Sequence, residues 1–161
     1  MRIGMVSTYP PTVCGLATFT SALERSLKAL GHRVDIVAVD DGIEPPDQAA
    51  SLAVLTSGSA LSTRRAAAQL SQCDVVVIQH EFGIFGGPDG EEVVDLVNLV
   101  SAPQVVVLHT VVSRPSTNQF RIIEALAASA QLLVVMSECA RARLLAVHQD
   151  LEPERVLMIP R

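Results

Sequence analysis

Four side chains in this 161-residue chain have types that could do chemistry: Cys14, His80, Glu81 and His109. Imidazole and carboxylate groups can ligate zinc, but these residues form no H-E-x-x-H motif and have no ligand partner at short spacing. We therefore expect no metal. A cysteine beside a histidine can act as a thiol nucleophile, but a structural cysteine near a helix start is the simpler interpretation of Cys14.

The usual cofactor-binding and hydrolase motifs are missing from the sequence. A dinucleotide fingerprint needs G-x-G-x-x-G directly after the first strand, and residues 7–16 contain only Gly15. The chain also lacks the G-x-x-x-x-G-K-[ST] of a P-loop and the G-x-S-x-G of the usual serine hydrolases. We expect no resident cofactor.

Short β-rich runs alternate with helical segments, and these elements must position the reactive side chains. Most runs are continuously apolar and β-branched, which is typical of strands buried on both faces. The clear runs span Arg2–Ser7, Val34–Val39, Asp74–Gln79, Gln104–Leu108, Leu132–Met136 and Val156–Ile159, with a weaker candidate at Leu52–Leu55. Apolar periodicity and helix-rich composition predict helices over residues 19–30, 63–70, 91–100, 117–129 and 138–147.

Strand–helix alternation along a whole chain predicts an α/β fold. We expect a doubly wound, Rossmann-like three-layer sandwich with a mainly parallel sheet of six or seven strands. Residues 1–161 are the size of a single domain. Residues 40–48 contain one glycine and two adjacent prolines, which predicts a surface loop.

The polar residues gather after particular strands. In such folds ligands bind outside the carboxyl ends of the strands, near the point where the strand order reverses. In the usual 3-2-1-4-5 order the first and fourth strands are neighbours at that point. The sequence therefore predicts that Gly15, His80, Glu81 and His109 line one cleft, with both histidines at its rim.

Several of these features have a simpler structural explanation. Ser137 precedes a predicted helix, so capping explains it at least as well as ligand contact does. Glu81 could be a solvated loop carboxylate, and the glycines of residues 83–90 could be turn glycines. His32 and His148 lie at the ends of predicted helices, where we expect them to be solvated.

Composition excludes several classes of protein. Hydrophobic residues make up 49% and charged residues 18%, so the chain can bury a core and is not disordered. The net charge is −5 and Arg64-Arg65 is the largest basic cluster, which argues against nucleic-acid binding. Three widely spaced cysteines fit a reducing compartment. Without a signal-peptide core or a transmembrane run, we expect a cytoplasmic protein.

Several short motifs, taken in order, resemble the first domain of nucleotide-sugar-dependent glycosyltransferases of the GT-B fold, in the retaining, glycosyltransferase family 4-like group. The resemblance covers nearly the whole chain. The motifs are S-T-Y-P-P from Ser7, C-G-L-A-T-F-T from Cys14, G-H-R-V from Gly31, Q-H-E-F-G-I-F-G-G from Gln79, L-H-T from Leu108, V-M-S from Val135 and M-I-P from Met158.

The resemblance implies roles for individual residues. His109 corresponds to a catalytic histidine beside the transferring sugar, and Gly15 to a glycine whose backbone approaches the donor diphosphate or the acceptor. His80 and Glu81 correspond to an acceptor-facing rim, and Ser137 to a donor- or acceptor-binding position. The implied reaction moves a sugar from a nucleotide-sugar donor to an acceptor with retention of configuration and without a metal.

The resemblance also implies partners. Members of the group have a second, C-terminal domain that holds most of the nucleotide-sugar contacts, and we expect such a domain beyond residues 1–161. We expect this chain alone to be inactive and to form a homodimer through exposed cleft surface. The alternative is a stand-alone, non-catalytic Rossmann-like binding or regulatory module.

Overall fold

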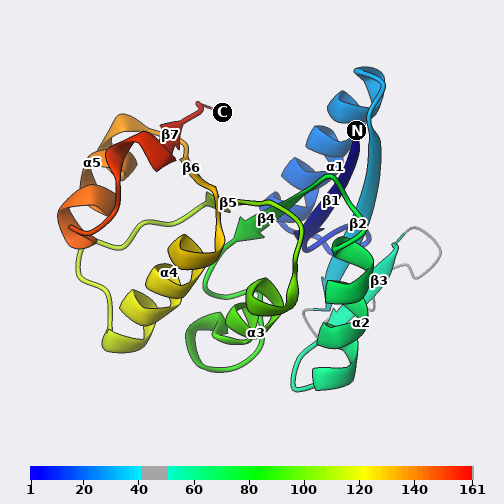
Figure 1. Cartoon of the computed structure of the whole chain (residues 1–161), viewed down its shortest axis with the longest axis horizontal. Coiled ribbons are helices and arrows are strands. Elements are labelled where there is room, and N and C mark those ends of the chain that lie inside the picture. The colour runs from blue at the N-terminus through cyan, green and yellow to red at the C-terminus, as the bar shows by residue number, and fades with distance from the viewer. Residues whose placement is uncertain (41–50, 161) are drawn as a thin grey trace.

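The computed structural model describes residues 1–40 and 51–160 and has one seven-stranded, wholly parallel sheet. The strand order is β3-β2-β1-β4-β5-β6-β7 (Figure 1). The predicted doubly wound, Rossmann-like α/β fold is confirmed. The predicted loop over residues 40–48 lies outside the described residues except for Asp40, which ends β2. The strands are β1 (Arg2–Ser7), β2 (Arg33–Asp40), β3 (Ala53–Thr56), β4 (Val75–His80), β5 (Gln104–Leu108), β6 (Leu132–Val135) and β7 (Val156–Met158).

The helices follow the strands in alternation and begin at side-chain caps in most cases. They are α1 (Gly15–Ala29), α2 (Ala60–Leu70), α3 (Glu92–Leu99), α4 (Thr117–Ser129) and α5 (Glu138–Val147), with short 3-10 turns at Pro88–Gly90 and Pro153–Arg155. Helices α1 and α2 begin earlier than the apolar periodicity predicts, at Gly15 and Ala60. Cys14 and Ser59 cap them by accepting hydrogen bonds from the backbone N–H groups of Ala17 and Ser62.

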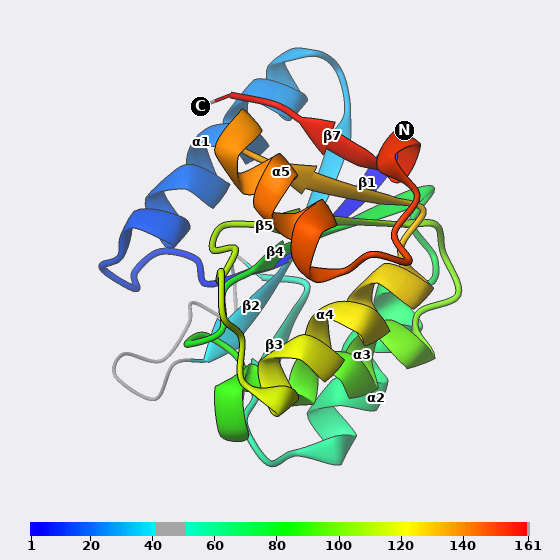
Figure 2. The ribbon, with the colours of Figure 1, turned by 90° about the vertical axis from the view of Figure 1, so that its left-hand side faces the viewer.

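The two faces of the sheet pack against different helices, because side chains alternate along each strand. On one face, Ile3, Met5, Val34 and Ile36 form a cluster with Leu23 and Leu27 of α1. On the other face, the larger core packs against α2, α3, α4 and α5. Figure 2 shows α1 at the upper left and α2, α3 and α4 at the lower right. This alternation decides which face each residue at a strand end can reach.

Beyond α1, its face of the sheet stays apolar but is less covered. Val105 and Leu132 are half-buried there, while Leu157 and Ile159 are 40% and 54% exposed. Homodimer formation through exposed cleft surface stays a prediction, and this exposed apolar face is a second place where copies could pair.

Glycine is required at position 4 by close packing between β1 and α2. A Cβ atom at Gly4 would lie 2.7 Å from Leu70 Cδ2 and 3.2 Å from Cys73 Sγ. Leu70 is fully buried, so its methyl group has little space to retreat. The glycine thus lets α2 sit close to the middle of the sheet.

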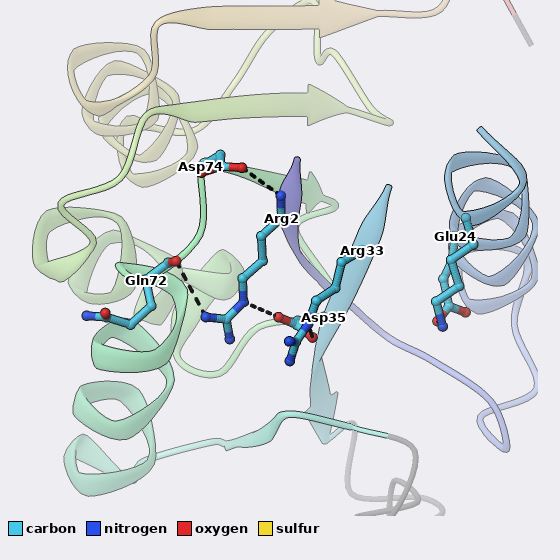
Figure 3. Close-up of polar contacts among 7 residues, drawn as sticks. Arg2, Glu24, Arg33, Asp35, Gln72 and Asp74 are labelled. Atoms are coloured by element: carbon cyan, nitrogen blue, oxygen red, sulfur yellow. Dashed lines mark hydrogen bonds and ion pairs between the residues drawn. The ribbon is translucent and has the colours of Figure 1, made fainter. Parts of the chain in front are cut away.

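Charged residues at the amino edge of the sheet pair with one another (Figure 3). Arg2 Nε donates to Asp35 Oδ2 at 2.5 Å, and Arg33 Nε lies 3.2 Å from Asp35 Oδ1. The backbone N–H of Arg2 donates to Asp74 Oδ2 at 2.7 Å. Partial burial alone would raise the pKa of Asp35, but hydrogen bonds from Arg2 and Arg33 outweigh it and hold that pKa below its usual value.

Histidine 148 was expected in solvent, and that prediction is wrong. Its side chain is 4% exposed, stacks on Phe120 with ring centroids 4.5 Å apart, and its Nδ1 lies 2.5 Å from Glu124 Oε1. The ring therefore joins the end of α5 to α4. Among the described residues, no helix is both long and apolar enough to cross a membrane.

Candidate functional site

The reversal of strand order places the candidate site between β1 and β4. Strand β1 pairs with β2 on one side and with β4 on the other, and β4 pairs next with β5. In open α/β sheets, ligands bind outside the carboxyl ends of the strands at such a point. This confirms the predicted arrangement of the first five strands.

His109 directly follows β5 and is half-buried. Its Nε2 lies 2.7 Å from Oε1 of Gln79, which is fully buried in β4. The Phe19 ring of α1 meets the imidazole edge-on, with centroids 5.3 Å apart. Because both neighbours belong to regular elements, the imidazole is held by the sheet on one side and by α1 on the other.

His80 does not lie on the open rim that the sequence predicted. It is the last residue of β4 rather than the first residue after it, because His80 pairs with Leu108 and its carbonyl accepts from the His109 backbone N–H at 3.0 Å. Because side chains alternate along a strand, the His80 side chain points to the face that packs against α2–α5. Phe82 packs edge-on against it at 4.9 Å and Phe85 is stacked at 6.2 Å, and the side chain is fully buried.

The surroundings of His80 favour its neutral form. Within the part of the chain that the structure describes, neither ring nitrogen has a hydrogen-bond partner. Burial, and to a lesser degree the neighbouring His109, lowers the pKa of His80 from 6.5 to about 4. At neutral pH the ring is therefore uncharged.

Glu81 is tied down by hydrogen bonds at the start of the loop after β4. Its Oε2 accepts from Thr110 Oγ1 at 2.6 Å, and its Oε1 accepts from the backbone N–H of Phe82 at 3.1 Å. Thr110 is the residue after His109, so this carboxylate links the loops that follow β4 and β5. The side chain is half-buried and lies beside the His109 segment, and its predicted place in a ligand-binding cleft stays a prediction.

Gly15 is the exposed first residue of α1. No atom lies within 4 Å of the place where its Cβ would be, so packing within the described residues does not require glycine there. The preceding Cys14 is structural, as expected: its Sγ accepts from the Ala17 backbone N–H at 3.3 Å and contacts Thr8 Oγ1 at the same distance.

Ser137 is exposed and caps α5, where its Oγ accepts from the backbone N–H of Ala140 at 3.1 Å. This confirms the capping interpretation. The hydrogen bonds described for Ser137 all lie within α5 and do not reach His109. A ligand contact by Ser137 stays a prediction.

The glycine-rich loop after β4 owes most of its glycines to its own folding. Gly87 and Gly90 have φ values of 78° and 77°, which disfavour other residues. A Cβ at Gly86 would collide with Ser57 and Glu92. Asp89 anchors the loop, because its carboxylate accepts from the side-chain amide of Gln119 at 3.2 Å in the first turn of α4.

A cavity elsewhere on the molecule contains none of the predicted site residues. It has a volume of about 490 Å³ and lies between α2 and α3, with Arg64, Asp95 and Asn98 in its lining. The adjacent Glu92 carboxylate already accepts from the Gly58 backbone N–H at 2.9 Å. No group of three or more potential metal ligands occurs among the described residues.

No family model and no curated protein matches the sequence. Solved structures do match. An alpha-glucosyltransferase in complex with UDP and a 13-mer DNA containing an HMU base has a TM-score of 0.64 and 15% identity, over 99% of this chain and 42% of that chain. An alpha-glucosyltransferase in complex with UDP has a TM-score of 0.61 and 15% identity, over 94% and 40% of the two chains.

A further alpha-glucosyltransferase, in complex with UDP-glucose and DNA containing an abasic site, has a TM-score of 0.56 and 18% identity over 86% of this chain and 36% of that chain. The chain shares its fold with the matched part of these glucosyltransferases. Identities this low concern the fold alone, so the family 4-like assignment stays a prediction. The chain spans about two fifths of the length of these glucosyltransferases.

Sequence reasoning missed Gln79 as a site residue. The signal was present, because Gln79 is a polar residue at the end of an otherwise apolar strand. A polar side chain that is fully buried in such a strand needs a partner, and His109 supplies one.

Proposed function

We propose that this chain is the acceptor-side domain of a glycosyltransferase and that His109 lies beside the sugar during transfer. The observation that carries the proposal is the position of His109, half-buried at the carboxyl end of β5 and held by Gln79 and Phe19. Open α/β sheets bind ligands at this edge. The glycosyltransferase-like fold supports the proposal, since the solved structures that share it contain UDP or UDP-glucose.

In the proposed reaction, the bond between the anomeric carbon of the sugar and the departing diphosphate oxygen breaks. A bond from the same carbon to an acceptor oxygen forms, and the acceptor proton leaves with the diphosphate. The resemblance to retaining GT-B glycosyltransferases implies that the sugar keeps its anomeric configuration. The domain contributes by holding the acceptor and the sugar in one geometry, which can supply much of the rate enhancement.

The diphosphate is expected to be bound elsewhere. The neighbours Phe19, Gln79, His80, Glu81 and Thr110 include no lysine or arginine, and the guanidinium of Arg143 in α5 donates to the Val111 carbonyl in the loop after β5 at 3.0 Å. Stabilising a leaving diphosphate takes positive charge or aligned backbone donors. We therefore propose that a second domain supplies most of these contacts, with Gly15 and Ser137 of this chain at the border of the donor site.

The charge of this chain argues against DNA as its acceptor. Proteins that bind DNA neutralise phosphates with clusters of lysine and arginine. Here the net charge is −5, and Arg64-Arg65 is the largest basic cluster. The proposed acceptor is a neutral, hydroxyl-bearing molecule. We also propose a cytoplasmic location, which suits the unpaired Cys14, Cys73 and Cys139.

The test uses residues 1–161 labelled with ¹⁵N and a panel of nucleotide-sugars that includes UDP-glucose. We expect weak binding, with amide shifts confined to the loops after β1, β4 and β5, and no sugar transfer. Robust transfer by residues 1–161 alone would overturn the two-domain proposal. If no donor shifts the amides of these loops, the proposed sugar site at this edge is wrong, and the stand-alone binding module is the remaining hypothesis. A 13-mer DNA duplex measured in parallel tests nucleic-acid binding.

A further inference from the structure

The side chain of Gln79 is unusual because it is polar in an otherwise apolar, buried strand. It is fully buried, and its one described side-chain hydrogen bond joins Oε1 to His109 Nε2 at 2.7 Å. The amide nitrogen of Gln79 has no partner among the described residues. Gln104 in the same sheet also leaves one amide end unpartnered among the described residues, so what distinguishes Gln79 is its partner, the imidazole of His109.

A second buried glutamine shows what a structural role looks like in the same sheet. Gln104, at the amino end of β5, donates from Nε2 to the backbone carbonyls of Val97 and Val100 at 3.0 and 3.2 Å. It thereby caps the end of α3. Gln79 instead faces a half-buried imidazole at the carboxyl edge, so the two glutamines form a matched pair with different partners.

The partner atom on Gln79 decides the protonation of the imidazole. A carbonyl oxygen only accepts hydrogen bonds, so a 2.7 Å contact with His109 Nε2 requires the ring proton to be on Nε2. Phe19 limits the rotation of the same ring from the α1 side. Together they determine both the tautomer and the plane of the ring.

We infer that Gln79 is a positioning residue: its side-chain carbonyl fixes His109 as the Nε2–H tautomer in one orientation at the candidate site. The tautomer assignment stands independently of the reaction. Only the use of this tautomer in sugar transfer rests on the proposed function. In that reaction, the fixed His109 ring would present the same nitrogen to every ligand.

The experiment records long-range ¹H–¹⁵N correlations of the imidazole rings in the folded chain at neutral pH. In the unmodified chain we expect His109 to be protonated on Nε2. Loss of one hydrogen bond shifts such an equilibrium by up to about tenfold. Gln79→Leu should therefore turn one dominant tautomer into a mixture, while the matched control Gln104→Leu should leave His109 unchanged.

A second variant keeps the test decisive if Gln79→Leu does not fold. Gln79→Glu retains an acceptor oxygen, so the Nε2–H form should persist, and the added negative charge should raise the pKa of His109 in an NMR titration. A His109 protonated on Nδ1 in the unmodified chain would mean that the Gln79 amide is inverted, and would overturn the inference. An unchanged tautomer in Gln79→Leu would do the same. Neither outcome depends on sugar transfer, whose failure is detected separately by the donor panel.

Discussion

Acid should destabilise this protein through His80 well before its carboxylates are protonated. The folded chain holds His80 neutral because burial, and secondarily His109, lowers its pKa from 6.5 to about 4. The unfolded chain binds a proton at the ordinary pKa. Between pH 6.5 and 4 the unfolded state therefore holds more protons, so stability falls as the pH falls. Above pH 6.5 this contribution is complete and constant.

The magnitude follows from the difference between the two pKa values. Each pKa unit corresponds to about 1.4 kcal/mol, so a fall from 6.5 to about 4 is worth about 3 kcal/mol, most of which is lost by about pH 4.5. That is a large fraction of the stability of an ordinary domain. The lowered pKa of Asp35 acts in a separate window, because its contribution is lost only below the usual value of 3.8.

The assay is urea unfolding at a series of pH values from 7.5 to 4.5, for the unmodified chain and for His80→Leu. The variant puts an apolar side chain beside Phe82 and Phe85, in place of an imidazole that has no hydrogen-bond partner within residues 1–40 and 51–160. Between pH 7.5 and 4.5, we expect the free energy of unfolding of His80→Leu to fall by about 2–3 kcal/mol less than that of the unmodified chain. His32→Gln, in the turn between α1 and β2, should keep the original dependence. If His80→Leu keeps it too, the reasoning about His80 is wrong.

Three further predictions follow from packing and exposure. Gly4→Ala should lower the free energy of unfolding in urea by about 1–3 kcal/mol, because the new methyl group meets the buried Leu70. Gly15→Ala, where no described atom outside the local backbone lies near the new methyl group, should change it by less than about 0.5 kcal/mol. Equal effects would contradict the packing argument. His109→Ala in the full-length protein should lower turnover by about 10²-fold while changing the melting temperature little, and early melting with full specific activity would make His109 structural. Self-association in sedimentation should weaken on Leu157→Lys if the exposed apolar face forms the dimer, and an unchanged dimer would place the interface elsewhere.

The parallel sheet could be predicted from the sequence because most strands are short, continuous apolar runs, and the order of the first five is the usual one for this fold class. Runs such as Val105–Leu108 leave no alternative to a parallel sheet that is buried by helices. The ends of strands were less predictable. The sequence predicts Gln79 as the last residue of the fourth strand, and only pairing with Leu108 of β5 adds His80 to β4. Because side chains alternate along β4, His80 then faces the layer of α2–α5 and Gln79 faces the side of α1.

Local signals for helix starts were also incomplete. Apolar spacing places the first helix at Phe19, but the cap at Cys14 adds a full turn before it. A cysteine is an uncommon cap, so sequence rules that favour serine, threonine, aspartate and asparagine pass over it. The burial of His148 was missed for a different reason. Its partners Phe120 and Glu124 lie on another helix, and nothing local indicates that contact.

The two edges of the sheet divide the molecule into regions under different constraints. At the amino edge, Asp35 pairs with the Arg2 side chain and Asp74 accepts from the Arg2 backbone N–H, so a change to either aspartate removes a partner from Arg2. At the carboxyl edge, Gly15 and Ser137 are exposed, and their substitution disturbs little beyond a helix cap. In a saturation scan scored by protein abundance, the amino edge should tolerate few substitutions, while exposed positions of the carboxyl edge tolerate many. When the same variants are scored by activity, the exposed positions of the carboxyl edge should be the less tolerant ones. Positions that tolerate substitution in the abundance scan but not in the activity scan would therefore mark the ligand-binding surface, even with the ligand unknown.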